Sequence, residues 1–248
     1  MKTILMAATA ALWSAAAMAA EVKVLSAGAV EPGLHKAVEL FKKASGHDVT
    51  IQFNTAPQIA KRLADGYVAD ILIAPPGGLK QFAEQGKVAV DGHVAVGKVG
   101  AGITVRPGAP VPDVKTTDAL KAAVLAADSL VYNTASTGLY IEKLFDRLGV
   151  GEQLKAKTTR HANGEAVMEY VIKGKGNEIG FGAITEIKLY EVKGALQLAG
   201  PLPADVQNYT SYIAALMSNA LTPDAAKAFL AFLGTAAAKQ AFVSAGVE

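Results

Sequence analysis

The chain has 248 residues, of which 51% are hydrophobic, and its formal net charge is +2. Because the charges are nearly balanced and form no run of one sign, we expect no nucleic-acid or membrane-surface partner. The sequence contains no cysteine, which excludes disulfides, thiol catalysis and a lipid anchor on cysteine. The length is sufficient for one large or two small domains with a substantial core.

The first residues have the pattern of a secretory signal peptide. Lys2 is followed by an apolar stretch that ends at Ala17-Met18-Ala19, where small residues suit a cleavage site. The apolar stretch is too short to span a membrane. We therefore expect residues 1–19 to be removed near Ala19 and the mature protein to be periplasmic.

Strand and helix patterns alternate over the first half of the mature chain. Strand-like runs at 22–25, 49–53 and 69–75 are each followed by a helical pattern, at 32–45, 57–66 and 78–86. Pro57 suits a first helical position, and Gly46 suits a helix end. This βαβαβα order predicts a parallel sheet that is covered by helices on both faces.

A second series of elements predicts a second lobe. We expect strands at 102–108, 129–133, 178–184 and 208–218, and helices at 116–127, 137–149, 163–174, 222–234 and 235–246. The chain is expected to leave the first lobe near 97–104 and to return near 206–213. The predicted fold is therefore α/β and two-lobed, with residues 20–100 and 206–248 in lobe 1, residues 101–205 in lobe 2, and two hinge crossings.

Four loops that follow a strand and precede a helix are rich in small, hydroxyl and amide residues. They are residues 26–30, 54–58, 133–138 and 161–164. Ligands of open α/β sheets bind at the carboxyl ends of the strands, where helix N-termini also concentrate partial positive charge. This arrangement predicts a small anionic or strongly polar ligand. The candidate binding residues are Ala27, Gly28, Ala29, Asn54, Thr55, Gln58, Ser136, Thr137, Arg160 and Asn163.

These residues also have purely structural interpretations. Asn54, Thr55, Ser136 and Thr137 are typical helix caps, although capping and ligand contact can coexist. Arg160 can form a bidentate pair with a carboxylate, but it can equally be a solvated loop residue beside other basic side chains. Both interpretations remain open at this stage.

Catalytic patterns are weak. The four histidines lie far apart and have no metal-ligand spacing, and there is no G-x-S-x-G segment. The glycine-rich segment 174–182 lacks the ending of a phosphate-binding loop and precedes a strand. Glu165 and Glu169 suit a solvated helix face. We therefore expect no enzymatic activity, no metal and no cofactor.

Several segments resemble the periplasmic molybdate-binding proteins of ABC importers. They are the strand–loop–helix at 24–43, FNTAPQIAKRL (53–63), GYVADILIA (66–74), TGLYIEKLFDRLG (137–149), IGFGAI (179–184) and the closing helices at 227–247. The resemblance spans nearly the whole mature chain. It implies a two-lobed, hinge-closing solute-binding protein, a monomer that delivers its ligand to an ABC permease in the inner membrane.

This chain differs from the molybdate-binding proteins that it resembles at specific ligand-binding positions. Molybdate binders place a serine where this chain has Ala29 and a tyrosine where it has Ala183, whereas Thr55, Ser136 and Thr137 still offer hydroxyls. An oxyanion held by neutral donors needs nearly all its lone pairs satisfied. We therefore favour a small organic carboxylate and keep molybdate or tungstate as the alternative.

Two further classes of function remain as alternatives. An exported sensing or adhesion protein could use the same fold to signal ligand to a partner. An exported enzyme acting on a phosphorylated or carboxylated metabolite is the third hypothesis, which the absence of a catalytic motif disfavours.

Overall fold

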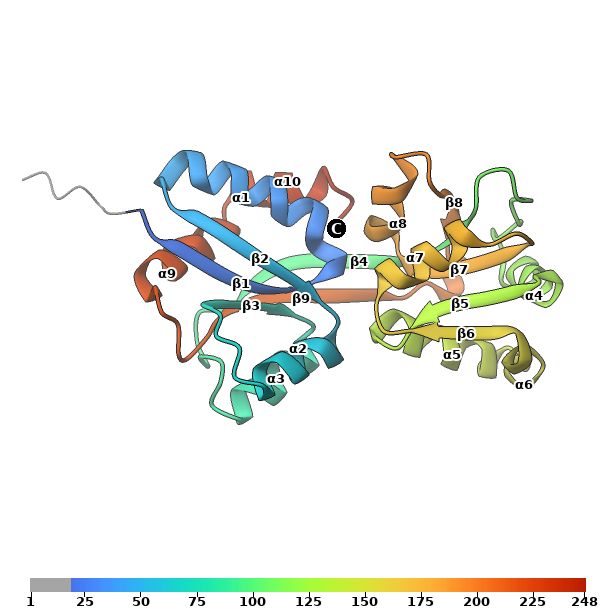
Figure 1. Cartoon of the computed structure of the whole chain (residues 1–248), viewed down its shortest axis with the longest axis horizontal. Coiled ribbons are helices and arrows are strands. Elements are labelled where there is room, and N and C mark those ends of the chain that lie inside the picture. The colour runs from blue at the N-terminus through green and yellow to red at the C-terminus, as the bar shows by residue number, and fades with distance from the viewer. Residues whose placement is uncertain (1–18) are drawn as a thin grey trace, which may run out of the picture.

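Two long strands join the two halves of the molecule (Figure 1). The computed structural model describes residues 19–248, so nearly all of the predicted signal peptide lies outside the described residues. β4 (Val94–Val105) and β9 (Tyr209–Leu216) are antiparallel from the pair Val94–Ala214 to the pair Gly100–Tyr209. From Ala101 onward, β4 pairs instead with β7 (Glu178–Ala183). β4 and β9 are thus the strands that run between the two lobes.

Lobe 1 is built on a four-stranded part of the sheet in the order β2-β1-β3-β9. β1 (Glu21–Ala27), β2 (Asp48–Asn54) and β3 (Ile71–Ala74) are parallel, and β9 is antiparallel to β3. All four residues of β3 are buried, because helices cover both faces of the sheet. One face packs against α1 (Glu31–Ser45), α9 (Pro223–Leu233) and α10 (Ala236–Val243), and the other against α2 (Ala56–Ala64) and α3 (Pro76–Glu84).

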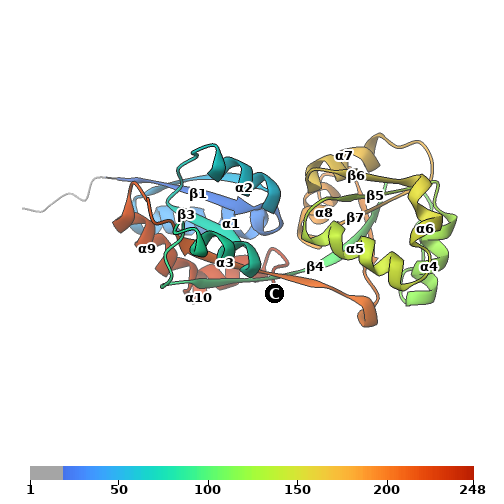
Figure 2. The same cartoon turned by 90° about the horizontal axis from the view of Figure 1, so that it is seen from below.

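Lobe 2 continues the sheet in the order β4-β7-β5-β6, and β8 (Gln197–Pro201) also pairs with β4. β5 (Ser129–Asn133) is parallel to both β6 (Thr158–His161) and β7. One core contains α4 (Thr117–Ala126), α5 (Ser136–Arg147) and α6 (Gly151–Leu154), and the other contains α7 (Gly164–Lys173) and α8 (Ile184–Glu191). Figure 2 shows the two lobes side by side, with β4 and β9 between them. Three short 3-10 helices complete the described chain: η1 (Gly28–Val30), η2 (Lys155–Lys157) and η3 (Ala204–Val206).

The prediction of a two-lobed α/β fold is confirmed, and several elements need correction. β4 begins at Val94, before the predicted start at residue 102, because its first half pairs with β9 at the hinge. The sequence analysis missed α6, β6, α8 and β8. β6 has the polar sequence TTRH and no buried residue, so no apolar alternation marks it as a strand.

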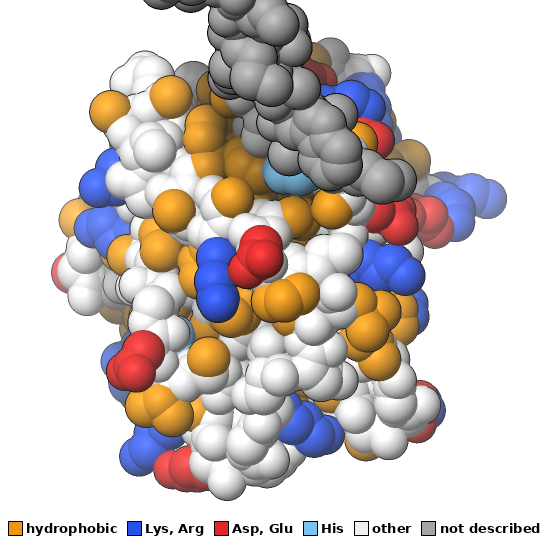
Figure 3. All heavy atoms as spheres, turned by 90° about the vertical axis from the view of Figure 1, so that its left-hand side faces the viewer, with side chains coloured by type: hydrophobic (Ala, Val, Ile, Leu, Met, Phe, Trp, Pro, Cys, Tyr) orange, Lys and Arg blue, Asp and Glu red, His pale blue; other side chains and the backbone are white. Residues whose placement is uncertain are grey.

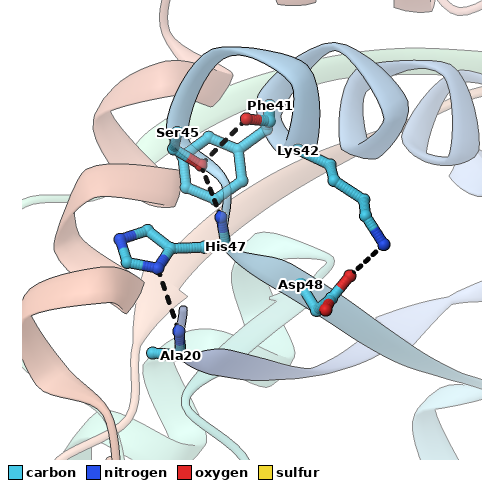
Figure 4. Close-up of polar contacts among 6 residues, drawn as sticks. All are labelled: Ala20, Phe41, Lys42, Ser45, His47 and Asp48. Carbon is cyan, nitrogen blue, oxygen red and sulfur yellow. Dashed lines mark hydrogen bonds and ion pairs between the residues drawn. The ribbon is translucent and has the colours of Figure 1, made fainter. Parts of the chain in front are cut away.

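The beginning of β1 is attached to the turn between α1 and β2 (Figure 4). The backbone N–H of Ala20 donates to Nδ1 of His47 at 3.1 Å, and the Ser45 hydroxyl links the carbonyl of Phe41 to the N–H of His47. Gly46 ends α1 in the left-handed conformation with φ 75°, which glycine adopts without steric cost. These contacts hold β1 in register beside β2, so that both strands end at the same edge of the sheet.

The surface at the free end of lobe 1 is mixed in character. Figure 3 shows acidic, basic and apolar side chains interspersed on the visible part of that face. Within residues 19–248, every helix is too short or too polar to cross a lipid bilayer.

Candidate functional site

Strand–helix junctions from both lobes meet in a cleft between them. The cleft contains a narrow cavity of about 40 Å³ and a wider one of about 390 Å³ that adjoins it. Gly28, Asn54, Thr55 and Glu186 line both cavities, which makes them two parts of one site. Lobe 2 also contains a cavity of about 400 Å³, but all its lining residues come from that lobe, so it is separate from the interlobe cleft.

The first junction brings backbone rather than side chains to the cleft. Ala27, Gly28 and Ala29 follow β1 directly and line the narrow cavity. A Cβ atom at Gly28 would lie 2.8 Å from Oε1 of Glu186 on lobe 2. The small residues here therefore allow a carboxyl group of one lobe to approach the backbone of the other.

The second junction contains two residues that cap a helix and one side-chain amide whose oxygen has no hydrogen-bond partner among the described residues. Oε1 of Gln58 accepts hydrogen bonds from the backbone N–H of Thr55 at 2.8 Å and from its hydroxyl at 3.0 Å. Thr55 and Gln58 thus cap α2 while they line the cleft. Oδ1 of Asn54 is buried and has no hydrogen-bond partner among the described residues. Of these three side chains, Asn54 has the most capacity left for a ligand.

Asn133 organises the third junction, at the start of α5. It is 5% exposed, and its Oδ1 accepts hydrogen bonds from the backbone N–H groups of Ala135 at 3.0 Å and Gly138 at 3.1 Å. Ser136 and Thr137, which line the narrow cavity, are the first two residues of the helix held in this way. A Cβ at Gly138 would overlap the carbonyl oxygen of Asn133, so a glycine is needed for this tight turn.

The fourth junction carries Asn163 into the wider cavity. Its Oδ1 accepts from the backbone N–H of Ala166 at 2.9 Å and caps α7, which leaves the amide nitrogen of the side chain free of that bond. Gly164 follows at the first helical position, and a Cβ there would meet the Glu186 carboxylate. Gly28 and Gly164 therefore form two sides of a slot for Glu186.

Arg160 does not join this site, contrary to the sequence-based expectation. It lies in β6, its guanidinium is 3.0 Å from the carboxylate of Glu142 on α5, and it lines the lobe 2 cavity with Tyr132. Side chains alternate between the two faces of a strand, so the side on which Arg160 projects depends on the register of β6. Because β6 was not predicted, the sequence could not indicate that side.

Glu186 is an ionisable residue of the cleft that the sequence analysis missed. It occupies the third position of α8, is partly buried and lines both cavities. Burial raises the pKa of its carboxyl to about 7, a hydrogen bond from the backbone N–H of Ala183 partly opposes this rise, and Glu31 adds to it. The available signal was a fifth strand–helix junction, residues 183–186, with a glutamate at the position that folds back onto the helix start.

Tyr212 of β9 also lines the narrow cavity. It is 4% exposed. Burial raises the pKa of its phenol far above the usual value, the Glu186 carboxylate raises it further, and the hydroxyls of Thr210 and Ser136 oppose the shift. Tyr212 therefore stays protonated and is a hydrogen-bond donor at neutral pH.

Charged residues from both lobes line the wider cavity. Glu31, Glu165 and Lys193 line it together with Tyr190. Burial raises the pKa of Glu31, His35 opposes this shift, and Glu165 adds to it. Lys193 is the basic side chain among the residues that line this cavity. Among residues 19–248, no group of three or more His, Asp or Glu side chains is arranged to hold a metal ion.

Comparisons with known proteins place the chain in a family. Residues 22–248 match the family described as "Bacterial extracellular solute-binding protein". An aconitate isomerase of Pseudomonas sp. is 30% identical over 231 residues, which cover 91% of this chain and 86% of that protein.

Solved structures share the fold at lower identity. The periplasmic molybdate-binding protein of Azotobacter vinelandii superposes with a TM-score of 0.75 at 16% identity, covering 92% of this chain and 98% of that one. The sulfate-binding protein SubI of Mycobacterium tuberculosis gives 0.73 at 17% identity, covering 92% and 86%. The resemblance to the molybdate-binding type of fold is thus confirmed, and the chain belongs to the bacterial extracellular solute-binding proteins.

Proposed function

We propose that the protein captures a small organic carboxylate between its two lobes in the periplasm and presents it to an ABC permease. The observation that carries this proposal is the meeting of strand–helix junctions from both lobes on one cleft. Backbone N–H groups, the hydroxyls of Ser136 and Thr137 and the Tyr212 phenol are neutral donors suited to an anion. A ligand that contacts both lobes favours their closed arrangement.

Two features favour an organic carboxylate over molybdate or tungstate. The hydroxyls that molybdate binders use are replaced by Ala29 and Ala183, which line the narrow cavity with methyl groups. The wider cavity, at about 390 Å³, has the size of sites for organic molecules. The 30% identical relative is named for its action on aconitate, a carboxylate of this class.

A thermal-shift panel of molybdate, sulfate, citrate, cis-aconitate and trans-aconitate tests the proposal. A ligand present at 100 times its dissociation constant stabilises the native state by about 2.7 kcal/mol, which corresponds to a shift of about 5–10 °C for a chain of this size. We expect a shift with one or more carboxylates. A shift with molybdate alone would show that the carboxylate assignment is wrong.

A matched pair of variants locates the binding site. Thr137→Val removes a hydroxyl that lines the narrow cavity, whereas Thr50→Val removes an exposed one on β2. We expect Thr137→Val to weaken carboxylate binding by about tenfold, the loss of one good hydrogen bond, and Thr50→Val to leave it unchanged. Equal effects of the two substitutions would place the ligand elsewhere.

Isomerisation of a small unsaturated carboxylic acid is the second candidate function. It is favoured by the relative named aconitate isomerase and by the carboxyl group of Glu186 inside the cleft. The test is direct: cis-aconitate or trans-aconitate is incubated with the protein, and the appearance of the other isomer is followed by proton NMR. No conversion above the protein-free rate would leave ligand capture as the function.

Delivery to a permease needs its own measurement. We expect uptake of the bound carboxylate by cells to fall when the gene for this protein is deleted and to return with the wild-type gene. Unchanged uptake, combined with a changed response to the ligand outside the cell, would favour the sensing role instead.

A further inference from the structure

The Glu186 carboxyl is held where a bound ligand must meet it. It projects from the start of α8 into the slot between Gly28 of lobe 1 and Gly164 of lobe 2. A side chain at either glycine would occupy the space of its oxygens. The slot opens to both cavities, so a ligand in either part of the cleft lies beside this carboxyl.

Glu186 and Tyr212 are the ionisable side chains among the residues that line the narrow cavity. The phenol of Tyr212 keeps its proton, because burial and the neighbouring Glu186 carboxylate both raise its pKa. Glu186 therefore remains as the group in this cavity that can gain and lose a proton near neutral pH. The other titratable groups that line the cleft, or pair with a group that does, are Glu31 and His35 on α1, Glu165 on α7, Tyr190 on α8 and Lys193 after it.

Burial brings the pKa of Glu186 close to neutral pH. The pKa is raised to about 7 by burial, with the nearby Glu31 adding to the rise and the N–H of Ala183 opposing it. A general base is most effective when its pKa lies close to the operating pH, since the ionised form is then both populated and basic.

We propose that Glu186 transfers a proton between two carbon atoms of a small unsaturated carboxylate bound in the cleft. This inference rests on the proposed binding of a carboxylate there. The substrate class has a CH₂ group next to a carbon–carbon double bond, with carboxylates on either side that stabilise charge on the intermediate.

The reaction needs no other reactant. The Glu186 carboxylate takes a proton from the CH₂ carbon, and the electron pair of that C–H bond forms a new double bond to the central carbon. The electrons of the original double bond move to the far carbon and its carboxylate. Glu186 then returns the proton to the far carbon, which gives the isomer and regenerates the Glu186 carboxylate.

The rest of the cleft is suited to stabilise the intermediate. Its negative charge is delocalised onto a carboxylate, where the hydroxyls of Ser136 and Thr137 and the Tyr212 phenol are available as donors. The helices α5 and α7 begin at the cleft, so their unpaired N–H groups add positive partial charge. The donors therefore stabilise the charge and Glu186 carries the proton.

Hydrogen exchange into the ligand tests the inference. cis-Aconitate and trans-aconitate in D₂O are each incubated with the wild type, Glu186→Gln and Glu169→Gln, and loss of the CH₂ and vinyl proton signals is followed by NMR. Glu169 is an exposed residue of α7 paired with Lys173 and serves as the matched control. We expect exchange with the wild type and Glu169→Gln, and a loss of at least 100-fold with Glu186→Gln.

Thermal shifts on the same samples separate this inference from the proposed function. A carboxylate-induced shift with neither deuterium exchange nor isomerisation by the wild type would overturn proton transfer and leave ligand capture standing. No shift with any carboxylate would overturn both. Wild-type exchange that persists in Glu186→Gln would remove Glu186 from the reaction.

The pH profile of the wild type covers the case in which Glu186→Gln does not fold. The exchange rate should rise about tenfold per pH unit at low pH and level off at or above pH 7, because the ionised carboxyl is the reactive form. A rate that is flat between pH 5 and 9 would overturn the assignment of this residue.

Discussion

The molecule has two cavities of similar size and different chemistry. The lobe 2 cavity measures about 400 Å³ and the wider part of the interlobe cleft about 390 Å³. In the lobe 2 cavity, Arg160 is paired with Glu142 and Lys155 with Glu152. In the cleft, Glu186 has no ion-pair partner among the described residues, and Oδ1 of Asn54 has no hydrogen-bond partner there. Volume does not distinguish the two cavities, whereas unsatisfied polar groups do.

The strongest test of this difference is the removal of Asn133, which shapes the narrow part of the cleft. Asn133→Ala leaves a buried N–H group (Gly138) and a partly buried one (Ala135) without their acceptor, so we expect the free energy of unfolding to fall by about 2–4 kcal/mol. Urea denaturation measures this change. Ligand affinity should fall as well, because Ser136 and Thr137 lose their support. A destabilisation below about 0.5 kcal/mol would mean that Asn133 does not organise α5.

The second test measures how much ionisation of Glu186 lowers the free energy of unfolding. Its raised pKa means that the native state holds the proton up to about pH 7, whereas the unfolded chain releases it near the model value of 4.5. Stability is therefore lost as the pH rises from 4.5 to 7, and the loss is complete above pH 7. We expect Glu186→Gln to raise the free energy of unfolding by about 1–3 kcal/mol at pH 8 and by little at pH 4.5, since each pKa unit corresponds to about 1.4 kcal/mol.

Urea denaturation of both proteins at the two pH values checks this expectation. Equal stabilities at pH 8 would show that the carboxyl is better solvated than its position in the slot implies. A stabilisation confined to pH 8 would show that the site carries a cost to stability, as functional sites often do.

The third test is the pH dependence of ligand affinity. A bound anion near Glu186 disfavours the ionised carboxyl, so binding favours uptake of a proton. Above pH 7 we expect the affinity to fall by up to about tenfold per pH unit, until the carboxyl is ionised in the complex too. Calorimetry in buffers of different ionisation enthalpy measures the proton uptake, which should disappear in Glu186→Gln. The same titration that weakens binding supplies the base for proton removal.

The smallest effect is expected in the lobe 2 cavity. Arg160→Ala removes an ion pair with a partly exposed carboxylate, so stability should change by less than about 1 kcal/mol. Carboxylate affinity should stay within about twofold of the wild type, which isothermal titration can establish. A tenfold loss of affinity would reverse the comparison between the two cavities and return Arg160 to the candidate site.

Regular features of the sequence predicted most of the fold. Buried strands such as ILIA of β3 and helix boundaries such as Pro57 follow from local pattern and propensity. The small-residue loop at residues 27–29 was also recognisable, because a strand followed directly by a helix exposes backbone N–H groups.

The position of Glu186 depended on information that a local pattern does not contain. α8 has no strong apolar stripe, because it packs both on lobe 2 and on α1 of lobe 1. Arg160 was assigned to the wrong cavity because the register of an unpredicted strand decides which way it projects. Tertiary contacts, rather than propensity, fix both residues: contacts between the lobes place Glu186, and strand pairing within lobe 2 places Arg160.

A buried hydrogen bond joins the two lobes beside Glu186. The hydroxyl of Thr185 donates to the carbonyl oxygen of Ala29 at 2.6 Å, fully buried, and so joins α8 to lobe 1 next to Glu186. A contact within the chain therefore places the Glu186 carboxyl beside Gly28 before any ligand binds. Its placement is preorganised. Folding already supplies the free energy needed to bury the carboxyl in this slot, so ligand binding has only to position the ligand against it.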